Sequence, residues 1–262
     1  MGAFSARSWP KGGGAPPATR SAGCRRNWAG RLPGRRSVGT WESSGRGAKV
    51  GRRSHVKKDP AAEVAFREGG LEEKFNAPDV PAGRPLRVWV SEETRFGLHT
   101  VHRRMWGLPG VRVSVPHQQK DEWDDTYGAV EVTRAGSVFC FQSAVSQECS
   151  GPFLEQISRD DPAALHGVIQ DGAGFHFPED DARLPANVRL ITLPASCPEL
   201  HPVEKLWDHL QEVVCNQVSP SIEALRAALQ RWLADFWQDE RRAFSLIGRG
   251  WLWFQVNAGG KT

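Results

Sequence analysis

Two acidic residues that are far apart in the sequence directly follow stretches typical of β-strands. Glu92 comes just after the β-rich run 86–90, and Asp171 ends the short apolar run 166–170. Runs of this length and composition, bounded by turn residues or charges, are typical of buried strands. Because neighbouring strands can end at the same edge of a sheet, we expect these two carboxylates to lie close together.

A third carboxylate, Glu204, lies where the sequence predicts the start of a helix. Pro202 suits the first position of a helix, which places His201 at the N-cap and Glu204 at the third helical position. The free backbone N–H groups of a first helical turn favour an ionised carboxylate. Helix starts and strand ends can meet at one edge of a sheet, so we expect Glu204 beside the other two acids.

Three carboxylates that meet at one place repel each other unless a cation lies between them. Oxygen ligands of this kind select hard cations, Mg²⁺ or Mn²⁺, over Zn²⁺. Two such ions can hold the attacking and the leaving oxygen of a phosphodiester. Glu92, Asp171 and Glu204 are therefore the candidate catalytic residues and the candidate metal ligands. Spacing alone is a weak signal for them, because the chain has 30 acidic residues.

Four further side chains near these acids can contact the metal ligands or a nucleic acid. His176 follows the second acid by five residues, and His201 precedes the third by one helical turn. Asp208 lies four residues after the third acid, on the same face of the predicted helix. Arg95 stands near the first acid and can bind a phosphate or balance the acids. Each also has an ordinary alternative: a hydrogen bond in a loop, a helix cap, or a charge in solvent.

The rest of the pattern predicts a mixed α/β fold. Three early strands and two later ones, each of the later ones followed by a loop and a helix, are typical of a mixed sheet. Residues 126–132 and 137–142 are separated by a short turn and suit a hairpin. Further extended segments are expected over 103–115 and 188–193, and helices over 61–76 (interrupted at Gly69-Gly70), 152–158 and 219–237, the last capped by Ser219.

The formal net charge of +4 hides a division of the chain. Residues 1–60 hold 14 Lys and Arg against two acids, whereas the remainder carries more acids than bases. This first segment is rich in Gly, Pro and Ser and has no helical or strand periodicity, which predicts a disordered region over 1–56 and a globular domain over 57–262. Three explanations of this basic segment are open: a segment that binds phosphates, a transit peptide, or translation out of frame. We favour the third, because ordinary globular sequence begins abruptly near 54–60.

Composition also bounds the class of protein. No apolar run is long enough for a transmembrane helix, so no membrane partner is expected. Five Cys without paired spacing argue against a disulfide scaffold and for a reducing, cytoplasmic compartment.

Four motifs occur in one order along the chain. They are R-V-W-V-S-E-E-T-R-F-G-L at 87–98, R-R-M-W-G-L-P-G-V-R at 103–112, Q-D-G-A-G-F-H at 170–176 and L-P-A-S-C-P-E-L-H-P-V-E-K-L-W-D-H-L at 193–210. Together they resemble the DDE-type transposases of bacterial insertion sequences, in the branch related to mariner elements. The resemblance covers about residues 54–258, and the E-L-x-P-x-E-x-x-W segment is its most specific piece.

The resemblance implies an RNase H-like fold, with a mixed five-stranded sheet flanked by helices. It also implies two-metal phosphoryl transfer with Mg²⁺ or Mn²⁺, with Glu92, Asp171 and Glu204 in the positions of the family's acids. Water first cuts a DNA strand at the end of the element, and the freed 3′-hydroxyl then attacks target DNA. The implied partners are terminal inverted repeats, target DNA and a second copy of the chain in a homodimer. The implied location is the bacterial cytoplasm, at the nucleoid.

The chain departs from the family pattern in three places. The family has Asp at the position of Glu92, which is one methylene longer and moves the carboxylate by roughly 1 Å, enough to slow catalysis. It has Asn at the position of His201. Its helix-turn-helix modules, which precede the catalytic core, have no counterpart in 1–53. A degenerate transposase is therefore one expectation. A catalytically inactive RNase H-like domain that binds nucleic acid nonspecifically is the alternative.

Overall fold

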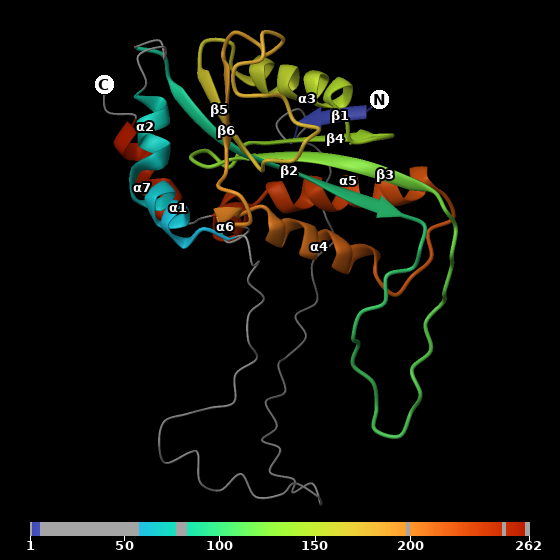
Figure 1. Cartoon of the computed structure of the whole chain (residues 1–262). Helices are drawn as coiled ribbons and strands as arrows, with labels where there is room; N and C mark the ends of the chain where they lie inside the picture. The colour runs from blue at the N-terminus through green and yellow to red at the C-terminus, as the bar shows by residue number, and fades with distance from the viewer. Residues whose placement is uncertain (1, 6–57, 77–82, 198–199, 248–249, 260–262) are drawn as a thin grey trace, which may run out of the picture. The chain divides into compact units, whose positions relative to one another are not determined.

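The strands expected from the sequence form one mixed sheet in the computed structural model of this chain (Figure 1). The structure describes residues 2–5, 58–76, 83–197, 200–247 and 250–259. They belong to one compact unit, Met1–Trp9 with Lys57–Thr262; a second unit, Pro10–Val56, lies outside the described residues. The strands are β1 (Gly2–Ser5), β2 (Leu86–Gly97), β3 (Trp123–Glu131), β4 (Ser137–Gln142), β5 (Leu165–Gln170) and β6 (Val188–Thr192).

The order of the strands is β1-β4-β3-β2-β5-β6, with β2 at the centre. Strand β2 pairs antiparallel with β3 and parallel with β5, so it joins the hairpin half of the sheet to the parallel half. The five expected strands, from β2 to β6, are confirmed. Strand β1 is a sixth and pairs antiparallel with β4. The prediction that 1–56 holds no strand is wrong for these four residues, because an edge strand needs only backbone partners. Residues 6–56 lie outside the described residues.

Side chains that alternate along the sheet build a core on each face. In β2, Val88 and Val90 belong to one core and Trp89 to the other. Helix α3 covers one face, and α4 and α5 cover the other (Figure 1). The helices are α1 (Pro60–Ala65), the π-helical turn η3 (Phe66–Gly70), α2 (Leu71–Phe75), α3 (Gln147–Asp160), α4 (Glu204–Val214), α5 (Ile222–Trp237), α6 (Glu240–Ile247) and α7 (Gly250–Gly259).

The helix signals in the sequence are confirmed in kind and shifted at their ends. The predicted interruption at Gly69-Gly70 lies in η3, where Gly69 leaves helical backbone geometry. Helix α5 is capped by Ser221, whose hydroxyl accepts the N–H of Ala224, rather than by Ser219. Ser221 is the later of two serines around Pro220, and it has the extended backbone of an N-cap. None of the helices described is long and apolar enough to span a membrane.

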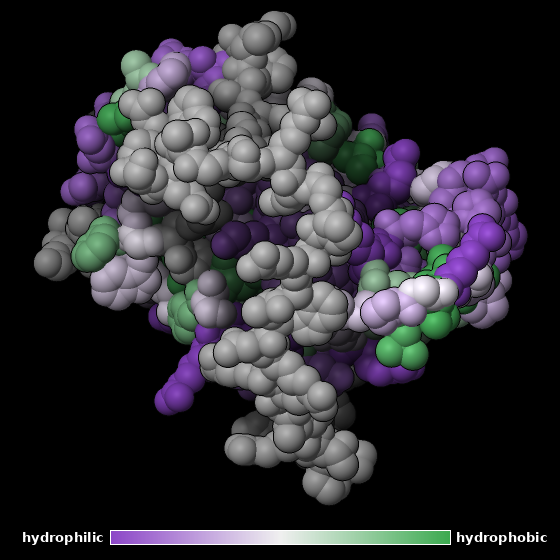
Figure 2. Space-filling view, turned by 90° about the horizontal axis from the view of Figure 1, so that it is seen from below, coloured by the Kyte–Doolittle hydropathy of each residue, from purple (hydrophilic) through white to green (hydrophobic). Residues whose placement is uncertain are grey.

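Residues 98–122, here called the arm, connect β2 to β3 and leave the sheet beside α4 (Figure 1). The stretch 103–115, which was expected to be extended, forms no strand. Asn216, just after α4, holds the base of the arm through its backbone N–H to Val101 and through its side chain to both backbone groups of Arg103. On the underside of the molecule, small apolar areas are scattered among hydrophilic ones (Figure 2).

Candidate functional site

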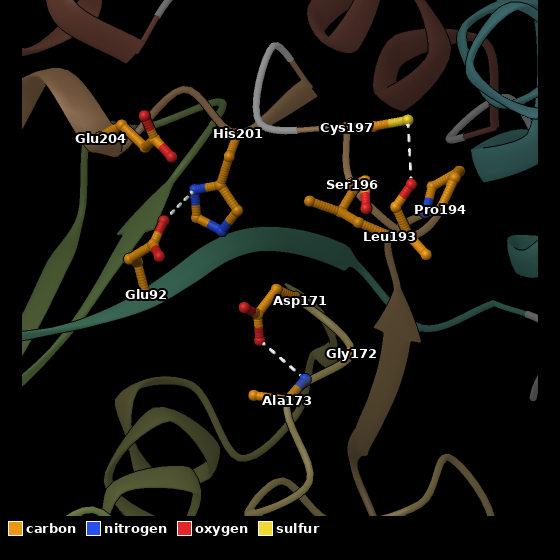
Figure 3. A pocket seen from close by; sticks show the side chains of 11 residues that line it. Glu92, Asp171, Gly172, Ala173, Leu193, Pro194, Ser196, Cys197, His201 and Glu204 are labelled. Carbon is orange, nitrogen blue, oxygen red and sulfur yellow. Dashed lines mark hydrogen bonds and ion pairs between the residues drawn. The ribbon is translucent and has the colours of Figure 1, made fainter. Parts of the chain in front are cut away.

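Glu92, Asp171 and Glu204 line one cavity of about 360 Å³ (Figure 3). Strand β2 supplies Glu92, the turn after β5 supplies Asp171, and the start of α4 supplies Glu204. The loop that follows β6 closes another side of the cavity with residues 193–197, and His201 forms part of the wall. The three acids that the sequence singled out therefore share one neighbourhood.

Glu92 was expected to follow the end of a strand. In the structure it lies within β2. The parallel pairing of β2 with β5 stops at Val90 opposite Ile169, whereas pairing with β3 continues and places Glu92 opposite Gly128. Because of its antiparallel pairing with β3, β2 continues to Gly97. Glu92 thus lies beyond the end of its parallel neighbour, at the same edge of the sheet as Asp171, and the expected meeting of the two acids is confirmed for a different reason.

The Glu92 carboxylate is turned toward His201. Its Oε2 lies 2.8 Å from Nδ1 of His201, and Nε2 of the same ring lies 2.9 Å from the backbone oxygen of Ser91. The His201 side chain is only 4% exposed and that of Glu92 21%. His201 therefore connects the segment before α4 to β2 directly at the first candidate ligand.

The predicted roles of His201 and Glu204 in the helix start are wrong. Helix α4 begins at Glu204, with Val203 in the cap position and no side-chain cap. His201 does not cap the helix, because its ring is buried and bonded to β2. Glu204 is the first helical residue rather than the third. It still lies at the positive end of the helix, where free N–H groups favour a carboxylate.

The Asp171 carboxylate is more open than that of Glu92. Its Oδ1 accepts the backbone N–H of Ala173, and the side chain is 53% exposed (Figure 3). His176, predicted as a contact in this region, lies against the same turn, with Nδ1 2.9 Å from the backbone oxygen of Asp171 and 3.2 Å from Oδ1. Since a carbonyl oxygen only accepts, Nδ1 carries a hydrogen and His176 closes the turn.

Glu93 is a site residue that the sequence analysis did not select. Its Oε2 lies 3.1 Å from Nε2 of His176, and both side chains are largely buried. Burial lowers the pKa of His176, but the hydrogen bond and charge of Glu93 and the bonds to Asp171 raise it more, so that the net shift is upward. Gln147 of α3 donates to the backbone oxygen of His176. Alternation along β2 was the available signal, since Glu92 and Glu93 face opposite sides of a strand.

The two remaining candidates lie outside the first cavity. Arg95 forms a two-pronged ion pair with Asp125 of β3, which raises the pKa of Arg95. Both line a second cavity of about 370 Å³ that also includes Glu92 and Asp171, so the two cavities adjoin. Asp208 lies elsewhere: its side chain is 75% exposed and paired with Arg103 of the arm.

The donor set fits a hard divalent cation in its chemistry. Three carboxylates around one cavity are the oxygen ligands that Mg²⁺ and Mn²⁺ prefer. The side chains do not converge as they stand, since Glu92 faces His201 and Asp171 faces Ala173 (Figure 3). Among the described residues, no three His, Cys, Asp or Glu side chains are arranged to hold a metal ion.

The part of the chain that carries the three acids matches known proteins. Residues 87–226 match the family model of the DDE superfamily endonucleases. An uncharacterized protein of Sinorhizobium fredii (strain NBRC 101917 / NGR234), y4pE/y4sA, is 30% identical over 91 residues, which are 34% of this chain and 67% of that protein.

Two solved structures of Mos1 share the fold. The Mos1 transposase paired-end complex with left transposon end has a TM-score of 0.54 at 14% identity, and the Mos1 mariner paired end complex with Mn has 0.55 at 15%. The matches cover 84% of this chain and 68% and 69% of those chains. This likeness confirms the expected RNase H-like fold. Because the family model spans more than half of the chain, from β2 into α5, the chain belongs to the DDE superfamily endonucleases.

Proposed function

We propose that this chain is a transposase-type DNA endonuclease and strand transferase that uses two divalent metal ions. The observation that carries the proposal is the meeting of Glu92, Asp171 and Glu204, from three separate elements, around one cavity. Membership of the DDE superfamily endonucleases supports it. So does the likeness of the fold to Mos1 complexes that hold a transposon end or Mn.

The three carboxylates are the residues that would hold Mg²⁺ or Mn²⁺. A pair of such ions supplies Lewis-acid stabilisation to the attacking and leaving oxygens of a phosphodiester. The rest of the site keeps these ligands in place. His176 fixes the turn that carries Asp171, and the pairing of β2 with β3 fixes the strand that carries Glu92. Arg95, which lines the second cavity, would contact a DNA phosphate.

The proposed chemistry has two steps. Water attacks phosphorus at the end of an element, the bond from phosphorus to the 3′-oxygen breaks, and a 3′-hydroxyl and a 5′-phosphate result. That 3′-hydroxyl then attacks a target phosphodiester and displaces its 3′-oxygen. We assign the chain to the insertion-sequence branch related to mariner elements, with terminal inverted repeats and target DNA as partners, a homodimer as the working form, and the bacterial nucleoid as its place.

Nicking of supercoiled plasmid in the presence of Mg²⁺ or Mn²⁺ tests this function. The matched control is Asp171→Ala, which removes a candidate ligand that makes few buried contacts. We expect nicking by the natural chain and a loss of at least about a hundredfold in the variant. Nicking that persists in Asp171→Ala would sink the assignment. Binding of plasmid by both proteins without nicking would instead support an inactive domain that binds nucleic acid nonspecifically.

A further inference from the structure

His201 is fixed in the wall of the cavity that the three carboxylates line. Its Nε2 lies 2.9 Å from the backbone oxygen of Ser91. Since that carbonyl only accepts, Nε2 carries a hydrogen and the orientation of the ring is set. The other ring nitrogen, Nδ1, therefore faces Glu92, with 2.8 Å between Nδ1 and Oε2 (Figure 3).

The two atoms of this contact depend on each other. Nδ1 of His201 and Oε2 of Glu92 are both buried, and neither makes a hydrogen bond in the part of the chain that the structure describes; each has the other 2.8 Å away. A buried carboxylate oxygen without a partner is unfavourable, so an Nδ1 that carries a hydrogen stabilises Glu92 in this orientation as an ion pair. A cation that binds Glu92 through Oε2 would take the place of the imidazole at that oxygen.

We propose that His201 competes with a divalent cation for the Glu92 carboxylate, so that a cation binds Glu92 only as His201 releases it. This inference rests on the function proposed above, because it treats Glu92 as a metal ligand. His201 is then a positioning residue that acts through Glu92. Two of the three departures from the family pattern, Glu92 and His201, are thus in contact with each other.

The test measures binding of Mn²⁺ alone to the full chain by isothermal titration calorimetry, without DNA. In His201→Leu, no polar side-chain atom remains to contact Oε2 of Glu92. We expect Mn²⁺ to bind roughly ten- to a hundredfold more tightly, the equivalent of one charge-assisted hydrogen bond. The matched control is His209→Leu, since His209 lies on α4 with 46% of its side chain exposed and outside the cavity. We expect no change there. Equal affinities in all three proteins would overturn the proposal.

A double-mutant cycle with Glu92→Asp tests the contact from its other side. The shorter carboxylate withdraws from His201, so in the natural background it should also relieve the competition. In the His201→Leu background no contact is left to relieve, and Glu92→Asp should not tighten Mn²⁺ binding further. We expect a coupling of about tenfold in Mn²⁺ affinity. Equal effects in both backgrounds would overturn the proposal. If His201→Leu does not fold, as judged by circular dichroism, His201→Ala replaces it in both measurements.

Asp171→Asn separates failure of this inference from failure of the proposed function. If Asp171→Asn abolishes Mn²⁺ binding while His201→Leu leaves it unchanged, the carboxylates hold the cation and only the competition is wrong. If Asp171→Asn binds Mn²⁺ as well as the natural chain does, the metal site itself is wrong and the proposed function fails with it.

Discussion

Glu92 of β2 and Asp171, which follows the neighbouring strand β5, each have a histidine beside them, and the two pairs differ. Nδ1 of His176 lies 2.9 Å from the backbone oxygen of Asp171 and 3.2 Å from its Oδ1, and the carboxylate is 53% exposed. His201 contacts Glu92 only at its carboxylate, which is 21% exposed. One histidine closes the turn that carries a candidate ligand, and the other is fixed at the carboxylate oxygen of a candidate ligand. If the proposed metal site is correct, the first arrangement supports it and the second obstructs it.

The backbone explains the difference. Asp171 begins a turn, so its carbonyl oxygen is available to a side chain. Ser91 and Glu92 both lie inside β2 and are paired with β3, but they come after Val90, where the pairing with β5 stops. His201 contacts the backbone oxygen of Ser91, and its second nitrogen then lies beside the Glu92 side chain. A candidate ligand within a strand thus presents its carboxylate to the segment that packs against that strand.

The strongest way to break this comparison is His176→Ala. The change leaves Glu93, which is 12% exposed, without its partner and frees the turn at Asp171. We expect the free energy of unfolding to fall by about 2 kcal/mol and plasmid nicking to be lost. Urea unfolding and the nicking assay measure the two effects. His209→Ala, on the exposed surface of α4, serves as the control and should change neither. A stable and active His176→Ala protein would show that the turn does not need its histidine.

Glu93→Gln is a smaller change that tests whether Glu93 acts by holding His176 or by binding a cation. The amide oxygen can still accept from Nε2 of His176, but the charge is gone. We expect a loss of about 1 kcal/mol in stability and a lower rate of nicking, with Mn²⁺ affinity unchanged because Glu93 holds His176 rather than a cation. Calorimetry with Mn²⁺ decides the point. A large loss of Mn²⁺ affinity would mean that Glu93, and not Glu92, is the ligand supplied by β2.

The grouping of the three acids was predicted from two signals. Strand-like runs before Glu92 and Asp171 and a helix start near Glu204 are visible in residue types, but they are a weak signal by themselves, and the resemblance of the four ordered motifs to a known family selected these acids among the 30 of the chain. What sequence could not give is which atoms bond across the cavity. His201 was predicted as a cap, because Pro202 and Glu204 suit a helix start. Its ring instead bonds the backbone oxygen of Ser91 in β2, which is 110 positions earlier in the chain.

The two ends of β2 differ in the same way in how well the sequence predicts them. Its apolar start was predicted, but its polar continuation to Gly97 depends on pairing with β3, 25 or more residues later in the chain. Propensity decides where a strand begins in the core, and a non-local partner decides how far it runs. The edge strand β1 is the extreme case, since its pairing with β4 has no local signal.

A third histidine, His166, is outside the cavity and is expected to make stability depend on pH. His166 of β5 is fully buried; its Nδ1 accepts from Nε1 of Trp89, and its Nε2 donates to the backbone oxygen of Asp161. Burial, helped by the charge of Arg87, lowers the pKa of His166. The folded state therefore resists protonation.

This shift makes stability depend on pH with a definite sign. Because the folded pKa of His166 lies below the unfolded value of about 6.5, its full contribution is present above pH 6.5 and is lost as the pH falls below it. We expect the unfolding temperature to decrease between pH 7 and pH 5. His166→Asn, whose amide oxygen can still accept from Trp89, should show a weaker decrease. An equal decrease in both proteins would assign the pH response to groups other than His166.

The smallest expected effect concerns Asp208, which the sequence placed near Glu204 and the structure places on the surface. Asp208 and Glu212 pair with Arg103 at 3.2 and 3.5 Å, with 75% and 62% of their side chains exposed. Exposed pairs of this kind contribute little, so Arg103→Gln should cost less than about 1 kcal/mol in urea unfolding. It should leave Mn²⁺ affinity unchanged, because the pair is remote from the cavity lining. A change in Mn²⁺ affinity would return Asp208 to the site and give α4 a second carboxylate there. The contrast between Glu92 and Asp171 would then no longer describe the proposed cation site.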